Sequence, residues 1–212
     1  MSVELLGWRR DTFAMYADVR AAADAALGWA GWRRRRDRMF ASHPQSPIED
    51  RAAFTGLPFA PYAAELRFVS EVRPAPPVRL DVATSDGVVP LDRIGRLDLP
   101  VGSLDVWWIG GYGGGLFVPF ADPTNGRTSY GGGRYLLDTI KGADLGGDGD
   151  RLVVDLNFGY HPSCAYSPRW SCPLAPEGNR LTVPIHAGEL LGPAAGGAAG
   201  GAAGGVGRGA AG

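Results

Sequence analysis

Residues 151–180 read RLVVDLNFGYHPSCAYSPRWSCPLAPEGNR, and we interpret this stretch as the organising segment of the fold. Its first part alternates between apolar and polar residues, which predicts a β-strand over 151–160 with one aliphatic and aromatic face. Pro162 ends strand pairing because its nitrogen has no hydrogen to donate. The rest of the stretch holds both cysteines of the chain, Cys164 and Cys172, among prolines and aromatic residues. That composition is typical of a loop that closes over a site.

Alternating segments also occur on the N-terminal side of this stretch, and turns rich in glycine or proline separate them. We expect short strands at 65–73, 78–84, 88–92, 95–99, 104–109 and 116–120, an extended segment at 134–140, and a last strand at 180–184. Many short strands at regular spacing are typical of an antiparallel β-sandwich or barrel. Helices do not alternate with these strands, which argues against a doubly wound parallel sheet.

The first part of the chain has the period of helices instead. Residues 3–27 place apolar side chains on one face, and Gly28 is expected to end this helix. A second helix is expected over 29–41. Residues 46–49 read SPIE, the spacing of a capping box, which predicts a short third helix that ends near residue 53.

These patterns predict a mainly β protein of α+β character: an antiparallel β-sandwich or barrel with two to three N-terminal helices. We expect residues 1–55 to pack on a β region at 56–191 as a single domain, since 212 residues can bury one sizeable core. Residues 192–212 consist mostly of glycine and alanine and cannot bury enough apolar surface to offset the entropy of ordering. A disordered C-terminal tail is therefore expected there.

The charge and hydropathy of the chain limit the classes of partner that it is expected to bind. The formal net charge is −1 at pH 7, which gives no general attraction to nucleic acid or to anionic membranes. The arginine run at 33–36 points in four directions on a helix, so a solvated face with ion pairs is favoured over a nucleic-acid contact. No apolar run is long enough for a transmembrane helix, and the N-terminus lacks the features of a signal peptide. We expect a cytoplasmic protein with reduced thiols and no membrane partner, whose oligomeric state the sequence leaves open.

Polar side chains concentrate around the strand expected at 151–160. On a strand, Asp155 and Asn157 would project side by side, with His161 beyond them if the strand continues. The bend at 130–135 reads YGGGRY, and two interpretations of it are open: an approach of Arg134 to a carboxylate or phosphate, or tight curvature of the sheet. We expect an unknown small molecule, polar or anionic, in a pocket lined by Tyr130, Arg134, Asp155, Asn157, His161, Tyr166 and Arg180.

Other interpretations use the same residues. In an acid–base hydrolase, Asp155 would be the general base with Asn157 orienting it; alternatively, Asp155 is a buried carboxylate that only fixes a loop. Cys164 beside His161 would be a nucleophile, although no oxyanion donor is evident. The side chains of His161, Cys164 and Cys172 suit zinc, but their spacing is not a standard one, so no cofactor is predicted and zinc stays an alternative. A structural or partner-binding module without a small-molecule site is the remaining interpretation.

The chain resembles the DUF1684 family, whose function is unknown, through several short motifs. These are LFVPF at 116–120 with Asp122, TSYGGGRY at 128–135, DLNF at 155–158, PSCAY at 162–166, CPL at 172–174, NRL at 179–181 and GE at 188–189, together with WRRRR at 32–36 and HPQSP at 43–47. The resemblance covers nearly the whole chain before the tail, and it implies no activity because none is established for the family. Asn often stands in the family where this chain has His161, so the resemblance does not imply an essential imidazole.

Overall fold

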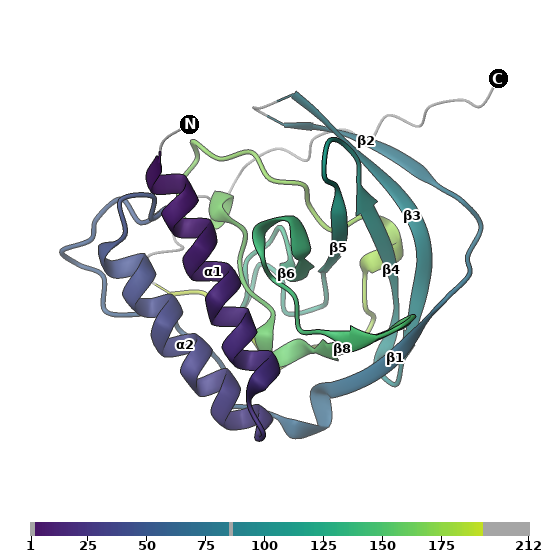
Figure 1. Cartoon of the computed structure of the whole chain (residues 1–212), viewed down its shortest axis with the longest axis horizontal. Coiled ribbons are helices and arrows are strands. Elements are labelled where there is room, and N and C mark those ends of the chain that lie inside the picture. Colours follow the sequence, from purple (N-terminus) through teal and green to yellow (C-terminus); the bar gives the residue numbers. More distant parts are fainter. Residues whose placement is uncertain (1–2, 85–86, 193–212) are drawn as a thin grey trace.

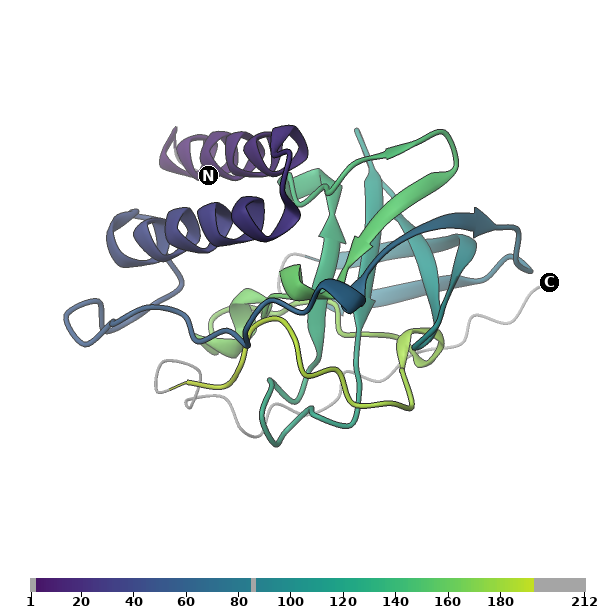
Figure 2. The same cartoon turned by 90° about the horizontal axis from the view of Figure 1, so that it is seen from below.

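The computed structural model describes residues 3–84 and 87–192 (Figure 1). It begins with two α-helices, α1 at Val3–Ala21 and α2 at Ala25–Ser42, which lie side by side as one layer (Figures 1 and 2). The tail expected at 192–212 lies outside the described residues except for Gly192. No helix among the residues described combines the length and the apolar character needed to cross a bilayer.

The helix boundaries differ from those expected. The first helix ends at Ala21, and Gly28 lies inside α2. Asp24 causes this shift because its carboxylate accepts a hydrogen bond from the backbone N–H of Leu27 at 2.8 Å and so caps α2. The third helix expected to follow the SPIE sequence is absent from the described chain, since Ser46 and Asp50 instead bond to nearby backbone groups.

An antiparallel sheet of eight strands follows and curves into a half-barrel (Figure 1). Its strands are β1 at Arg67–Arg73, β2 at Arg79–Thr84, β3 at Gly87–Leu99, β4 at Gly102–Ile109, β5 at Gly115–Phe120, β6 at Arg134–Asp138, β7 at Gly147–Asp148 and β8 at Arg151–Asp155. The order across the sheet is β6-β5-β4-β3-β1-β8-β7, and β2 pairs with β3 beside this path. The expectation of a mainly β, antiparallel fold with N-terminal helices is confirmed.

The long strand β3 makes the sheet bend. The two strands expected at 88–92 and 95–99 are one strand, whose first half pairs with β2 and whose end pairs with β1. The change of partner coincides with a shift in the register between β3 and β4 at Arg93/Gly95. A Cβ at Gly95 would lie 2.5 Å from Val72 Cγ1 and 2.7 Å from the carbonyl oxygen of Arg73, so only glycine lets the strands approach this closely.

Two other strands also end differently from the expectation. Strand β8 stops at Asp155, and a 3₁₀ turn at Leu156–Phe158 replaces the rest of the strand expected over 151–160. The strand expected at 180–184 is reduced to a single bridge between Ala121 and Arg180. In both places, side-chain hydrogen bonds from Asp155 and Asn179 take over bonds that a strand ladder would make.

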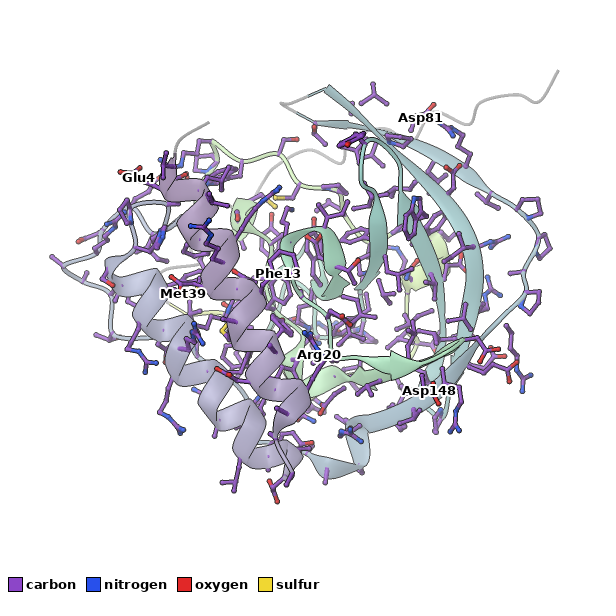
Figure 3. All side chains as sticks on the ribbon, in the orientation of Figure 1. Glu4, Phe13, Arg20, Met39, Asp81 and Asp148 are labelled. Atoms are coloured by element: carbon purple, nitrogen blue, oxygen red, sulfur yellow. The ribbon has the colours of Figure 1, made fainter. Side chains whose placement is uncertain are left out.

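One main core lies between the helix layer and the concave side of the sheet, where Figure 3 shows the interior filled with side chains. Tyr16 and Trp32 of the helices pack edge to face, and the Trp32 ring lies 5.0 Å from that of Phe158, measured between centroids. Strand residues such as Val118 and Leu136 belong to the same cluster. The helices therefore close the open side of the half-barrel and bury its interior.

Candidate functional site

Asp155 occupies the end of β8, where it is buried and fully engaged. Its Oδ1 accepts from the backbone N–H of Asn157 at 3.1 Å and from the Asn157 amide at 2.7 Å. Its Oδ2 accepts from the hydroxyl of Tyr62 at 3.1 Å, and Nε of Arg67 lies 3.9 Å from the same oxygen. Burial raises the pKa of Asp155 above its usual range, although these partners act in the opposite direction.

Asn157 ties the 3₁₀ turn to the segment that precedes β1. Its amide donates to the carbonyl of Ala63 at 2.8 Å, and its oxygen accepts from the backbone N–H of Ala63 at 2.8 Å. Its backbone carbonyl accepts from the indole of Trp29 at 2.9 Å. Both amide hydrogens are thus used, one on Ala63 and one on Asp155, so Asn157 holds structure together rather than offering donors to a ligand.

A groove opens beside Asp155, between the end of α1 and strands β1, β7 and β8. It has a volume of about 470 Å³. Its lining comprises Val19, Arg20, Ala22, Ala25, Arg67, Val69, Leu145, Gly146, Gly147, Asp148, Arg151, Val153, Asp155 and Phe158, and we call it the α1–β8 groove. Figure 3 shows Arg20 near the end of α1 and Asp148 on the β7–β8 hairpin.

Cross-strand pairing explains the floor of the α1–β8 groove. In the register of β1 and β8, Arg67 lies opposite Asp155, and Val69 lies opposite Val153. Because alternate residues share one face, these pairs line the same side of the sheet, and Arg151 belongs to that row. Val69, at the centre of this row, is 47% exposed and so offers apolar surface to the groove.

His161 lies elsewhere, in a buried polar cluster beneath α2. Its Nε2 accepts from the backbone N–H of Tyr130 at 3.1 Å, and its Nδ1 lies 3.7 Å from Oε1 of Glu189. Burial lowers the pKa of His161 to about 4, against the effect of Glu189 and with that of Arg134 and Arg36. The imidazole is therefore neutral at pH 7, with Nε2 as the acceptor nitrogen.

Glu189 is the centre of this cluster. Its Oε2 lies 3.2 Å from the Arg36 guanidinium and accepts from the backbone N–H of His161 at 3.0 Å. Its Oε1 accepts from the hydroxyl of Tyr166. The guanidinium of Arg36 stacks over the ring of Phe40 at 4.4 Å. The expectation of a solvated arginine face is therefore wrong for Arg36, which is buried, while Arg35 does form exposed ion pairs.

Arg134 is completely buried, and both Nη atoms of its guanidinium bond to protein groups, while its Nε has no hydrogen-bond partner. Its guanidinium lies 2.6 Å from Oδ2 of Asp122, and it donates to the carbonyl oxygens of Ile185 and Ala187. Burial acts to raise the pKa of Asp122, but the charge of Arg134 and the hydrogen bonds from Thr124 and Ile185 together outweigh it, and the pKa is lowered. The bend at 130–135 therefore places Arg134 in the core, where its hydrogen bonds to Ile185 and Ala187 hold the C-terminal segment against β6.

The structure brings together only part of the set expected from the sequence. Tyr130, His161, Cys164 and Tyr166 adjoin one another: the rings of Tyr130 and His161 are 5.9 Å apart, and the Tyr130 hydroxyl is 3.6 Å from the sulfur of Cys164. Asp155 and Asn157 belong to the α1–β8 groove and its surroundings instead. Arg180 is exposed, and its backbone bridges to Ala121. The expected residues thus lie in three separate places.

Cys164 and Cys172 are free thiols, each partly exposed. Among the residues described, no group of three or more His, Cys, Asp or Glu side chains is arranged to hold a metal ion. The acceptor nitrogen of His161 is occupied by Tyr130. Zinc at His161, Cys164 and Cys172, with Asp155 as a possible fourth ligand, stays the untested alternative that it was from the sequence, and elemental analysis of the purified protein can test it.

Sequence reasoning missed Arg36, Glu189, Tyr62 and Arg67 as parts of these sites. A signal for Arg36 was present, because Trp32, Arg36 and Phe40 recur at the spacing of one helix face. Glu189 belongs to the GE motif of the family resemblance, but nothing in that motif shows that its partners are Arg36 and His161. Tyr62 and Arg67 contribute through Asp155, which is distant in the chain, and no local pattern marks them.

Comparisons with known proteins give one family and an uncharacterised neighbour. The model of the family described as "Protein of unknown function (DUF1684)" matches residues 52–190. The solution NMR structure of an uncharacterized protein from Haloarcula marismortui is 38% identical, with a TM-score of 0.54. The match covers 75% of this chain and 90% of that chain. A comparison with curated proteins finds no match.

Proposed function

Because the chain belongs to the DUF1684 family of proteins of unknown function, we propose a function from its own surface: it binds a small organic anion in the α1–β8 groove. The observation that carries this proposal is the apolar floor of exposed Val69 and half-buried Val153, which lies in the same row as Arg67 and Arg151. An anion with a short apolar chain suits this surface, since the chain covers exposed carbon while the arginines pair with its charge.

The charges of the groove favour an anion. Arg20, Arg67 and Arg151 line it, against the carboxylates of Asp148 and Asp155. Arg20 also pairs with Asp144 at 3.6 Å, and Glu71 lies opposite Arg151 in the register of β1 and β8. Within the described residues, the structure gives Arg151 no ion pair. The oxygens of Asp155 already accept three hydrogen bonds, and one of them lies 3.9 Å from Nε of Arg67, which offsets part of the repulsion that this carboxylate would exert on a bound anion.

Other parts of the chain offer less support for a ligand. The guanidinium of Arg134 is used by Asp122, and Arg180 is exposed away from this groove. For the alternative of an acid–base hydrolase, both oxygens of Asp155 already accept hydrogen bonds from the protein, which disfavours a role as general base. The cytoplasmic location expected from the sequence belongs to this proposal too, and the free thiols of Cys164 and Cys172 are compatible with it.

Hexanoate, compared with the neutral 1-hexanol, tests the proposal by thermal unfolding and calorimetric titration. A ligand that binds only the folded chain raises its stability by mass action, so hexanoate is expected to raise Tm and hexanol is not. Arg151→Gln is expected to weaken hexanoate binding about tenfold, the equivalent of ~1.4 kcal/mol. Arg127→Gln removes an exposed charge outside the groove and is the matched control.

The same titration distinguishes binding in the α1–β8 groove from binding in the pocket expected from the sequence, which includes Arg180. Arg180→Gln is expected to leave hexanoate binding unchanged, whereas a pocket that includes Arg180 requires a loss. Equal effects of hexanoate and hexanol, or a Tm that neither compound changes, would contradict binding of organic anions in the groove.

A further inference from the structure

A second groove lies between α1 and α2, the two helices that pack side by side as one layer (Figures 1 and 2). It has a volume of about 620 Å³, and its lining comes from these helices and their short connection. One wall is a stripe of α2, where Leu27, Gly31, Arg34 and Arg38 follow at steps of four, three and four residues and so share a face. Asp18 of α1 lines the groove as well. We call this feature the helix groove.

Small residues line the helix groove where the two helices meet. A Cβ at Gly28 would lie 3.0 Å from the Cβ of Ala22, the one residue that this lining shares with the α1–β8 groove. A Cβ at Gly31 would have a terminal nitrogen of Arg34 at 3.9 Å, so this guanidinium lies beside Gly31. On the same stripe, the side chain of Leu27 is 72% exposed. The stripe thus presents an uncovered apolar side chain and, further along α2, a guanidinium.

The carboxylates of the helix groove already have partners in the protein, whereas two of its arginines do not. Asp18 pairs with Arg35 at 2.9 Å, and the carboxylate of Asp24 accepts a backbone hydrogen bond at 2.8 Å as the N-cap of α2. Arg34 and Arg38 are exposed, and among the residues that the structure describes neither of them has an ion pair. The groove therefore has an excess of positive charge at these two positions.

Asp37 lies between the two arginines in sequence but does not neutralise them. Its Oδ1 accepts from the backbone N–H of Leu57 at 2.9 Å, so its carboxylate is held by the segment that follows α2. Arg34 and Arg38 are four residues apart, which separates them by about 6 Å along the helix axis. Because guanidinium groups pair well with carboxylates, these two positions suit a partner with two acidic groups at the same spacing.

The distance between these features indicates an elongated partner. Leu27 precedes Arg34 by seven residues and Arg38 by eleven, which places it about 10 Å and about 16 Å from them along α2. A compact anion bound to the arginines would leave Leu27 uncovered. Residues 193–212 of this chain contain one arginine and no acidic residue, so they do not complement the groove in charge. A separate acidic segment of about three helical turns matches both the charges and the length.

We propose that the helix groove binds an acidic amphipathic helix of a partner protein. Two carboxylates one turn apart pair with Arg38 and Arg34, and an apolar side chain seven positions after the second carboxylate packs on Leu27. The bound helix runs antiparallel to α2. In that direction its carboxylates lie in its own first turns, where negative charge stabilises a helix.

An NMR titration of the full ¹⁵N-labelled chain tests this docking. The probe is an acetylated and amidated alanine-based peptide with two glutamates four positions apart and a leucine seven positions after the second. The comparison peptide has glutamine in place of both glutamates. The acidic peptide is expected to shift the backbone amides of Gly28, Gly31, Arg34 and Arg38, and the glutamine peptide is not. Absence of shifts, equal shifts with both peptides, or shifts confined to other parts of the chain would overturn the proposal.

Substitutions at exposed positions assign the contacts. The double variant Arg34→Gln/Arg38→Gln should bind the acidic peptide at least about tenfold more weakly, and Leu27→Ser should also lower the affinity because the apolar contact is lost. Arg127→Gln removes an exposed charge outside the helix groove and should bind as the wild-type protein does. Wild-type affinity in the double variant or in Leu27→Ser would contradict the proposed contacts.

A dilution series of the chain without peptide examines the alternative occupant, a second copy. The amides of the helix groove are expected to keep their positions at all protein concentrations. Shifts of these amides that grow with concentration and disappear in Arg34→Gln/Arg38→Gln would assign the groove to self-association and would overturn the proposal of an acidic partner.

Discussion

Arg36 and Glu189 form a buried ion pair, with Nη2 of the arginine 3.2 Å from Oε2 of the glutamate. The pair joins α2 to the C-terminal end of the described chain, 153 positions away. Glu189 also accepts hydrogen bonds from Tyr166 and from the backbone of His161, so three distant segments converge on one carboxylate. A buried charge of this kind is tolerated only with its partners present.

Removing the carboxylate of Glu189 should therefore destabilise the fold strongly. Glu189→Gln leaves the buried guanidinium of Arg36 without its counter-charge, and we expect a loss of about 3–5 kcal/mol in the free energy of unfolding, measured in urea. Asp18→Asn breaks the exposed pair with Arg35 and should cost less than ~1 kcal/mol. Similar losses in the free energy of unfolding for the two variants would show that the buried pair contributes no more to stability than the exposed pair.

His161 makes stability depend on pH. Its pKa in the folded state, about 4, is lower than the ordinary value of 6.5, so the unfolded chain binds more protons between these values. Stability is then lost as pH falls from 7 towards 4. Relative to His161→Asn, the wild-type protein should lose about 2 kcal/mol more between pH 7 and pH 5. The groups that face this imidazole, Glu189, Arg134 and Arg36, are retained in the variant.

The measurement is urea unfolding at both pH values. His186→Asn removes an exposed histidine and should keep the wild-type dependence on pH. If His161→Asn has the same dependence as the wild-type protein, the buried imidazole does not produce the effect.

Much of the fold could be predicted because its signals are local. Alternation over a few residues identified the strands, and helical periodicity identified two helices. The curvature and strand order could not be predicted, because they depend on pairings such as Phe68 with Val154 that join distant parts of the chain. The end of β8 was missed because alternation was extended past Asp155, whose carboxylate bonds to the backbone of Asn157 and turns the chain.

The candidate site was harder to predict for the same reason. An aspartate and a histidine close together in sequence, and an arginine on the bend at 130–135, were expected to share a pocket, yet each pairs with a residue outside that set. Arg134 pairs with Asp122, His161 faces Glu189, and Asp155 binds Tyr62. A buried charged or polar side chain needs a partner for its hydrogen bonds or its charge, but the sequence alone does not show which distant residue will be that partner.

Gly95 is expected to be required for the bend in β3. A side chain there collides with Val72 and with the backbone of Arg73, so Gly95→Ala should lower the free energy of unfolding by about 1–3 kcal/mol. At Gly131, the nearest atoms lie 3.9 Å from an added Cβ, and Gly131→Ala should change stability by less than ~0.5 kcal/mol. Thermal and urea unfolding of both variants measure the difference, and equal costs would rule out a steric requirement at Gly95.

A substitution at Asp155 can test whether its carboxylate only stabilises the fold or also contacts a bound ligand. Asp155→Asn replaces an acceptor oxygen with an amide that faces the donors of Asn157 or Tyr62, so about 1–3 kcal/mol of stability should be lost. The change removes no cation from the α1–β8 groove, so hexanoate should bind at least as well as in the wild-type protein. Asp148→Asn, at an exposed position of the groove lining, is the control and should leave stability unchanged within ~0.5 kcal/mol. A folded Asp155→Asn protein that no longer binds hexanoate would make Asp155 itself a ligand-contacting residue and would contradict a purely structural role for its carboxylate.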